Sequence, residues 1–103
     1  MSYHGAAITE LEARRLLSEG GKIEIFALQN TYSEGGHIKG RWKIEYTNES
    51  GQVFAIRLSH KSEIKIYKTP SSIFNFCSAA GLFSANIPLK GDTSVILEGP
   101  ASD

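Results

Sequence analysis

Basic and apolar residues alternate in the middle of the chain, in the order Ile38, Lys39, Gly40, Arg41, Trp42, Lys43 and Ile44. Successive side chains of an extended strand point to opposite faces of a sheet, so this alternation predicts one apolar face and one cationic face. Cations neutralise phosphates and release counterions, while aromatic rings stack on bases. The chemistry that these residue types could support is therefore the binding of nucleic acid.

The same alternation continues through the next two predicted strands. The predicted nucleic-acid-binding residues are Lys39, Arg41, Lys43, Arg57, Lys65 and Tyr67, with His37 beside them. Water-facing strand positions are also often Lys or Arg because long charged side chains are soluble there and discourage edge pairing. Solubility therefore explains these cations almost as well as nucleic-acid binding does. Tyr67 is the single aromatic ring predicted on this face, which is weak evidence for base stacking. An acidic protein is the other partner that such a surface favours.

The charge of the chain is unevenly distributed. The 103 residues include 11 Lys and Arg and 11 Asp and Glu, so the formal net charge is zero. Residues 37–68 hold seven basic against three acidic side chains, a net charge of +4, which leaves −4 for the rest. The whole chain thus gives no electrostatic reason to expect nucleic acid, a membrane or an acidic partner, and only the central segment does.

No catalytic or cofactor-binding motif stands out. Cys77 lies in a strongly apolar segment, where a thiol usually behaves as a small buried hydrophobe. The three histidines, His4, His37 and His60, lie far apart without metal-ligand spacing. The glycines of residues 35–40 resemble a phosphate-binding loop, but such loops follow a strand and open a helix, whereas these precede a strand. We therefore expect no catalytic residue, cofactor or metal ion, and a protein that is not an enzyme.

Length and composition indicate one folded domain. The chain is 41% hydrophobic and 21% charged, which is typical of globular proteins. We expect a single domain over residues 1–103, with residues 1–7 and 99–103 flexible. The single cysteine cannot form an internal disulfide, the first residues do not resemble a signal peptide, and no long apolar run is present. A cytoplasmic protein that does not associate with membranes is the expectation.

Two helices are predicted near the two ends of the chain. Thr9 and Glu12 have the spacing of a capping box, and Gly20 and Gly21 can end a helix, which predicts one over residues 10–19. Thr69 followed by Pro70 is typical of a helix start, so the second helix should run to about residue 80.

Strands fill the remaining apolar segments. The predicted strands cover residues 22–28, 37–47, 52–59 and 63–68, followed by short ones at 85–89 and 94–98. Residues 29–36 are predicted to be a polar connection with a mobile tip. This order predicts an α+β fold: an antiparallel four- to six-stranded sheet with two helices packed on one face.

The second predicted helix and the residues after it hold more apolar surface than one small sheet needs. Large exposed apolar patches on a small domain mark association sites, so a homodimer interface is predicted here. Its residues would be Ile73, Phe74, Phe76 and Phe83. The alternative is that Phe74 or Phe83 fills the end of the core.

The order of elements also resembles a known class of proteins. Residues 72–82 read SIFNFCSAAGL, a short helix that ends in AAGL. A capped amino-terminal helix, a curled antiparallel sheet, this helix and a final apolar strand resemble small accessory proteins, including a partition-associated type, encoded on plasmids and integrating elements. The resemblance covers most of the chain in the order of elements and implies no catalytic residues. It implies a non-enzymatic module from a mobile element that works near DNA or a DNA-handling protein.

Two functional hypotheses follow from the sequence. The first is a small non-enzymatic binding or accessory module that contacts nucleic acid through its basic sheet face. The second is a protein-interaction or structural subunit that self-associates through the apolar second helix. A small enzyme is the third class, which a concave pocket with convergent, perturbed polar side chains would favour.

Overall fold

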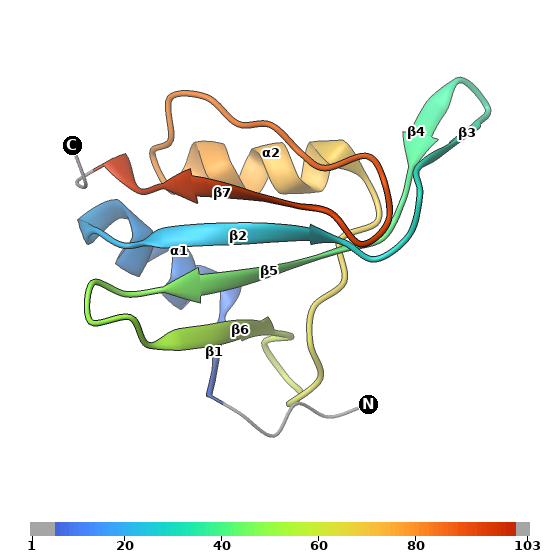
Figure 1. The fold of residues 1–103 in the computed structure, drawn as a ribbon. Coiled ribbons are helices and arrows are strands. Elements are labelled where there is room, and N and C mark those ends of the chain that lie inside the picture. Colours follow the sequence, from blue (N-terminus) through green and yellow to red (C-terminus); the bar gives the residue numbers. More distant parts are fainter. Residues whose placement is uncertain (1–5, 101–103) are drawn as a thin grey trace.

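The computed structural model describes residues 6–100 and contains a five-stranded sheet, a two-stranded sheet and two helices (Figure 1). The elements in chain order are β1 (Ala7–Thr9), α1 (Glu10–Glu19), β2 (Lys22–Ala27), β3 (Tyr32–Glu34), β4 (His37–Lys39), β5 (Trp42–Thr47), β6 (Val53–Arg57), α2 (Pro70–Ala79) and β7 (Ser94–Glu98). Residues 1–5 and 101–103, where most of the predicted flexible ends fall, lie outside the described part of the chain, as does His4. Ala7 belongs to β1, and the Gly99 N–H donates a hydrogen bond to the Gly21 carbonyl.

The five-stranded sheet has the strand order β1-β6-β5-β2-β7. Strands β2, β5 and β6 form an antiparallel meander, and β7 pairs antiparallel with the free side of β2. Strand β1 pairs parallel with β6 at the opposite edge. Strands β3 and β4 form a separate antiparallel hairpin, which projects from the body beyond β2 and β5 (Figure 1). We call this hairpin the arm.

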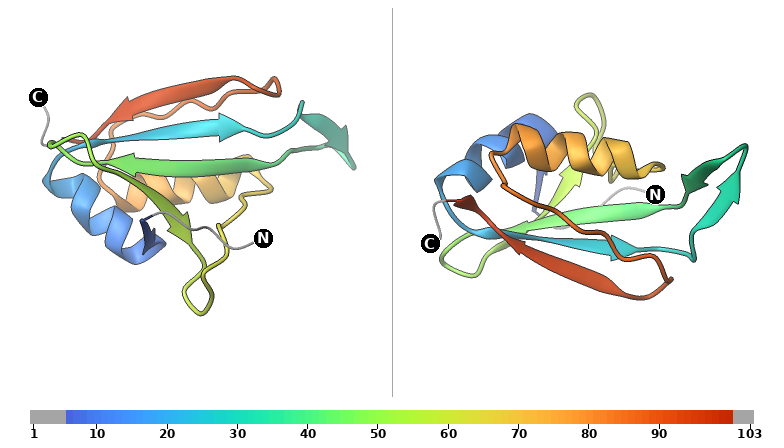
Figure 2. Two further views of the ribbon diagram at one scale, coloured as in Figure 1. Left: turned by 60° about the horizontal axis from the view of Figure 1, so that its bottom comes forward. Right: turned by 90° about the horizontal axis from the view of Figure 1, so that it is seen from above.

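Local sequence explains both helix starts. At α1 the Thr9 hydroxyl accepts from the Glu12 N–H at 3.2 Å and the Glu12 carboxylate accepts from the Thr9 N–H at 3.0 Å, which completes the predicted capping box. At α2 the Thr69 hydroxyl accepts from the Ser72 N–H at 3.3 Å. Both helices lie on the same side of the five-stranded sheet (Figure 2). The other side is called the outer face below.

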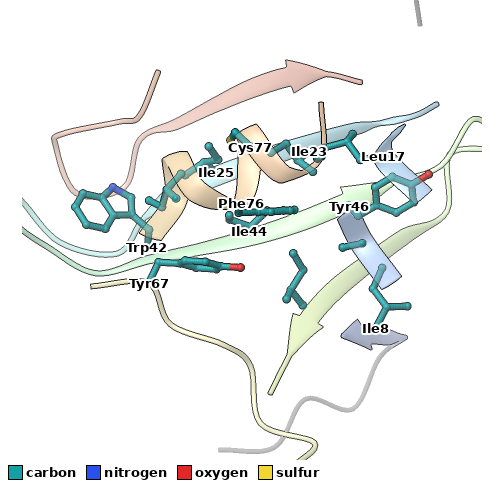
Figure 3. Packing of buried hydrophobic residues seen from close by; sticks show 14 of the residues in the cluster. Ile8, Leu17, Ile23, Ile25, Trp42, Ile44, Tyr46, Tyr67, Phe76 and Cys77 are labelled. Carbon is teal, nitrogen blue, oxygen red and sulfur yellow. The ribbon is translucent and has the colours of Figure 1, made fainter. Parts of the chain in front are cut away.

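The core lies between this sheet and the helices (Figure 3). Alternate residues of the central strands face it, and the fully buried side chains with the largest volumes are Trp42, Tyr67, Phe76, Leu17, Ile23, Ile25, Ile44, Ile56, Ile73 and Cys77. The rings of Tyr67 and Phe76 stack with centroids 6.4 Å apart. The Trp42 indole N–H donates a hydrogen bond to the Pro88 carbonyl at 2.8 Å, which satisfies the one polar group of that buried ring.

The predicted mixture of helices and antiparallel strands is confirmed, but the strands differ from the prediction in several places. The predicted strand 37–47 is interrupted at Gly40 and Arg41, so its first part joins β3 in the arm, and β3 lies within the predicted loop. Residues 63–68 make only isolated bridges, Arg57 with Ile64 and Trp42 with Tyr67. Residues 85–89 form no strand, and β1, whose pairing with β6 is parallel, was not predicted.

Candidate nucleic-acid interface

The structure separates the six predicted nucleic-acid-binding residues into three places. Lys39 and Arg41 lie at the base of the arm. Lys43 lies on the outer face of β5. Arg57, Lys65 and Tyr67 lie near the start of α1, which holds Glu10. The predicted single cationic sheet face is therefore not what the described residues form.

The outer face carries charges of both signs. Lys43 is paired with Glu45, with 3.4 Å between Nζ and Oε2, and its ammonium lies 4.9 Å from the centroid of the Phe26 ring. Lys43 is thus already engaged by its neighbours. Strands β5, β2 and β7 direct charged, polar and apolar side chains to the outer face. These are Lys43, Glu45, Thr47, Lys22, Glu24, Phe26, Ser94, Ile96 and Glu98. Three carboxylates among two ammonium groups make this face a poor match for a polyanion.

The predicted position of Tyr67 on a solvated face is wrong. Its side chain is 1% exposed, and its hydroxyl donates a hydrogen bond to the Glu10 carboxylate. The physical reason is register: Tyr67 bridges Trp42, and opposed residues of a bridge share a face, so both rings point into the core. Burial, followed by the hydrogen bond to Glu10, raises the pKa of Tyr67. Tyr67 therefore supports the core and offers no ring to a base.

Lys65 lies on the same side as Tyr67. Its ammonium is 2.8 Å from Oε2 of Glu10, the oxygen that also accepts from Tyr67. Burial acts to raise the pKa of Glu10, but the hydrogen bonds from Lys65 and Tyr67 and the charges of Lys65 and Arg14 outweigh it and hold that pKa below its usual 4.5. The ammonium of Lys65 is therefore already paired with a carboxylate of the same chain.

The base of the arm holds the cations that remain available. Gln29, Tyr32, Glu34, Lys39, Arg41 and Lys68 line a hollow of about 350 Å³, and we call these six residues the arm surface. The Gly40 N–H donates to the Lys68 carbonyl at 3.2 Å, which holds Lys68 beside the arm. Lys68 and Tyr32 were not predicted to act here. Lys68 falls within the +4 segment, but the place of Tyr32 depends on its pairing with Lys39, which needs the unpredicted hairpin.

The cations of the arm surface have no internal carboxylate partner. Within residues 6–100 the ion pairs are Arg15 with Glu19, Lys43 with Glu45, and Lys65 with Glu10. Lys39, Arg41 and Lys68 take part in none of them. The Tyr32 ring beside them is 49% exposed. Free cations next to an exposed ring are the combination that binds phosphate and base together.

A second hollow lies between β4 and the start of α2. It has a volume of about 480 Å³, and its lining includes His37, Lys39, Pro70 and Ser71. Pro70 and Ser71 belong to the first turn of α2, which contains no acidic residue. The amino-terminal end of a helix carries a partial positive charge that favours anions. Lys39 lines both hollows, so its ammonium group is shared between them.

The predicted dimer interface is only partly on the surface. Ile73 and Phe76 are buried in the core, which contradicts their placement in an interface. Together with Cys77 and Ala80 they have the i, i+3, i+4, i+7 spacing of one helix face, and that face is the buried one. Phe74 is 42% exposed and Phe83 is 92% exposed, so these two remain accessible.

Catalytic and metal-binding groups are sparse in the described residues. Cys77 is buried, and burial raises the pKa of its thiol to about 11, opposite to what a nucleophile requires. Within residues 6–100 no group of three His, Cys, Asp or Glu side chains could hold a metal ion. None of the helices in that range has the length and apolar character to cross a membrane.

Comparison with known proteins identifies no relative: no family model matches this chain, and neither the curated proteins nor the solved structures contain a significant match.

Proposed function

We propose that this chain is a non-enzymatic module that binds single-stranded nucleic acid on the arm surface. The observation that carries the proposal is the hollow of about 350 Å³ beside the exposed ring of Tyr32. In it Lys39, Arg41 and Lys68 outnumber Glu34 and have no ion-pair partner among residues 6–100. Cations supply affinity for the phosphates and an open ring supplies a stacking platform. An unpaired base can lie on this ring, whereas the bases of a duplex are already stacked on each other.

The two hollows suggest the path that the sugar-phosphate backbone of the bound strand takes. Phosphates bound by Arg41 and Lys68 lie in the hollow of the arm surface, and Lys39 lines both this hollow and the one beside α2. The next phosphate is then bound at the amino-terminal end of α2, where Pro70 and Ser71 line the second hollow. A segment of a few nucleotides would be held, as is typical of small single-strand-binding sites. A cytoplasmic, accessory role near DNA is part of this proposal.

Fluorescence anisotropy of labelled oligonucleotides tests it. Single-stranded DNA, single-stranded RNA and the matching duplex are titrated at low and moderate salt. We expect the single strands to bind more tightly than the duplex. Replacing both Lys39 and Arg41 by Gln should reduce the salt dependence, because each lost phosphate contact lowers the slope of log affinity against log salt by about 0.7. Tyr32→Ala should weaken binding by about 1–3 kcal/mol while leaving that slope unchanged.

The single variant Lys39→Gln is also measured, and Lys22→Gln is its matched control. Lys22 is exposed at the end of β2 remote from the arm, and its substitution removes the same charge. The proposal is overturned if no oligonucleotide binds at low salt, or if Lys22→Gln weakens binding as much as Lys39→Gln does. In the second case the protein attracts polyanions without a defined site.

A further inference from the structure

A third hollow, with an excess of cations, lies at the edge of the sheet formed by β1 and β6. It has a volume of about 410 Å³ and is formed by the start of α1, the end of β6 and the segment that follows β6. Its charged lining residues are Glu10, Arg14, Arg57 and Lys65. We call these residues with the hollow they line the α1 pocket. Three cations against one carboxylate leave a net charge of +2.

Carboxylates lie within electrostatic range of both arginines, Glu10 for Arg14 and Glu12 for Arg57, but neither pair is in ion-pair contact within residues 6–100. Both Lys65 and Tyr67 bond to Oε2 of Glu10. The Arg57 guanidinium donates only to the Leu58 carbonyl, at 3.2 Å, and neither arginine forms an ion pair with another residue of 6–100. The Nε of Arg14 is shut off from solvent and has no hydrogen-bond partner in the same range. Two guanidinium groups in one hollow repel each other, and the buried Nε of Arg14 lacks the hydrogen bond that would offset its loss of water, so an added anion in contact with both groups is favourable.

The shape of the pocket adds an apolar component. Leu11, which is largely exposed, and Leu58 line it together with the charged groups. The Ser59 hydroxyl also lines it and makes no hydrogen bond within residues 6–100, so it is free to donate to a ligand oxygen. A ligand that fits has an anionic head for the guanidinium groups and a carbon body for the leucines.

We propose that the α1 pocket binds a small organic phosphate monoester. Charge favours this class, because a phosphate monoester carries about two negative charges near neutral pH, which balances the net charge of the lining residues, whereas a carboxylate carries one. Its three terminal oxygens can accept from both guanidinium groups and from Ser59 together. The ester group then lies against Leu11 and Leu58. This site is independent of the arm surface, with which it shares no residue.

Titration of the full chain with phenyl phosphate, followed by backbone amide chemical shifts, tests the proposal. Inorganic phosphate and benzoate are titrated in parallel. We expect saturable shifts around Arg14, Arg57 and Ser59 with phenyl phosphate, weaker binding of inorganic phosphate because it lacks the apolar body, and weaker binding of benzoate because it has one charge. Affinity should rise as the pH is raised through about 6, where the monoester becomes a dianion.

Variants locate the site. Arg14→Gln and Arg57→Gln should each weaken phenyl phosphate binding by about tenfold or more, the usual loss for one hydrogen bond to a charged group. Arg15→Gln is the matched control, since Arg15 is on the same helix but pairs with Glu19 in solvent. Two separate arginine variants keep the test valid if one of them does not fold, which the dispersion of the amide spectrum reveals.

Each outcome decides the question. Absence of saturable binding, equal affinity for benzoate, or an equal loss in the Arg15→Gln variant overturns the proposal. An undiminished affinity in both the Arg14→Gln and the Arg57→Gln variant also overturns it, because the ligand is then bound elsewhere. Lys39→Gln should leave phenyl phosphate binding unchanged, which separates this site from the arm surface.

Discussion

The hydroxyl of Tyr67 donates a hydrogen bond to the carboxylate of Glu10, which lies 57 residues away in the sequence. The same carboxylate oxygen accepts from Lys65 at 2.8 Å. Glu10 is the first residue of α1, so the pair ties the start of this helix to the segment between β6 and α2. That segment has only isolated bridges to the sheet, and the link to Glu10 therefore contributes to holding it in place.

Removal of the Tyr67 hydroxyl tests the strength of this link. Tyr67→Phe keeps the buried ring but leaves Glu10 with one donor fewer. We expect the free energy of unfolding, measured by denaturant titration, to fall by about 1.5–3 kcal/mol, as for a hydrogen bond to a charged group. Tyr32→Phe, at an exposed ring without a hydrogen bond to the rest of residues 6–100, is the control and should change stability by less than about 0.5 kcal/mol. Equal losses in the two variants would mean that the Glu10 link does not stabilise the fold.

The low pKa of Glu10 makes the same link dependent on pH. Burial opposes the shift, but the bonds from Lys65 and Tyr67 keep the folded-state pKa below the ordinary 4.5. A carboxyl group with a depressed folded-state pKa adds stability above its unfolded-state pKa, and this contribution is lost as the pH falls through the folded-state value. Wild-type protein should therefore lose more stability on acidification below 4.5 than Glu10→Gln does. Denaturant titrations at a series of pH values compare the two, and parallel curves would contradict the assignment.

Helices were easier to predict from the sequence than strand pairing, for a physical reason. The capping box of Thr9 and Glu12 is a local interaction, so the spacing of these two residues in the sequence was enough to place the start of α1. The pairing of Tyr67 with Trp42 is long-range and depends on register, which alternation alone does not determine. Residues 63–68 form isolated bridges in place of a continuous strand, so their side chains do not keep a regular alternation between the two faces. The prediction for Tyr67 failed at this step.

The candidate site was predictable only in part for the same reason. The net positive charge of residues 37–68 is a property of the sequence, and Lys39 and Arg41 were identified from it. The arm surface also needs Tyr32 and Lys68, which reach Lys39 and Arg41 through the hairpin of β3 and β4 and through the Gly40 to Lys68 hydrogen bond. No local pattern in the segment of Tyr32 indicates these contacts.

Gly40 lies in the break between β4 and β5, where the Trp42 ring leaves no room for a side chain. A Cβ added to Gly40 would lie 2.6 Å from the Trp42 ring, and that ring is fixed by its hydrogen bond to Pro88. Gly40→Ala should therefore destabilise the fold by about 1–3 kcal/mol, as overpacking does. It should also shift the fluorescence of Trp42, the one tryptophan of the chain, towards longer wavelength. Gly51→Asn, in an open turn where φ is 86°, should leave the emission unchanged.

Cys77 provides a chemical readout of core opening. Its thiol is buried, and the pKa is raised to about 11, so thiolate is scarce at neutral pH. We expect a disulfide reagent to label the folded protein slowly and the denatured protein fast, with the labelled fraction following the unfolding transition. Rapid labelling under native conditions would instead indicate an accessible, activated thiol and would favour the small-enzyme alternative.

Phe76 and Phe83 separate core packing from self-association. Phe76 is buried against Tyr67, whereas Phe83 is 92% exposed beyond α2. Phe76→Ala should lower the free energy of unfolding by about 3–5 kcal/mol, the usual cost of removing a buried ring. Phe83→Ala should change the free energy of unfolding by less than about 0.5 kcal/mol in a monomer.

If the chain forms a dimer through this surface, sedimentation velocity should show a concentration-dependent dimer that Phe83→Ala dissociates. A monomer at all concentrations would remove the support for self-association, because Ile73 and Phe76 are already used in the core and only Phe74 and Phe83 remain of the predicted interface.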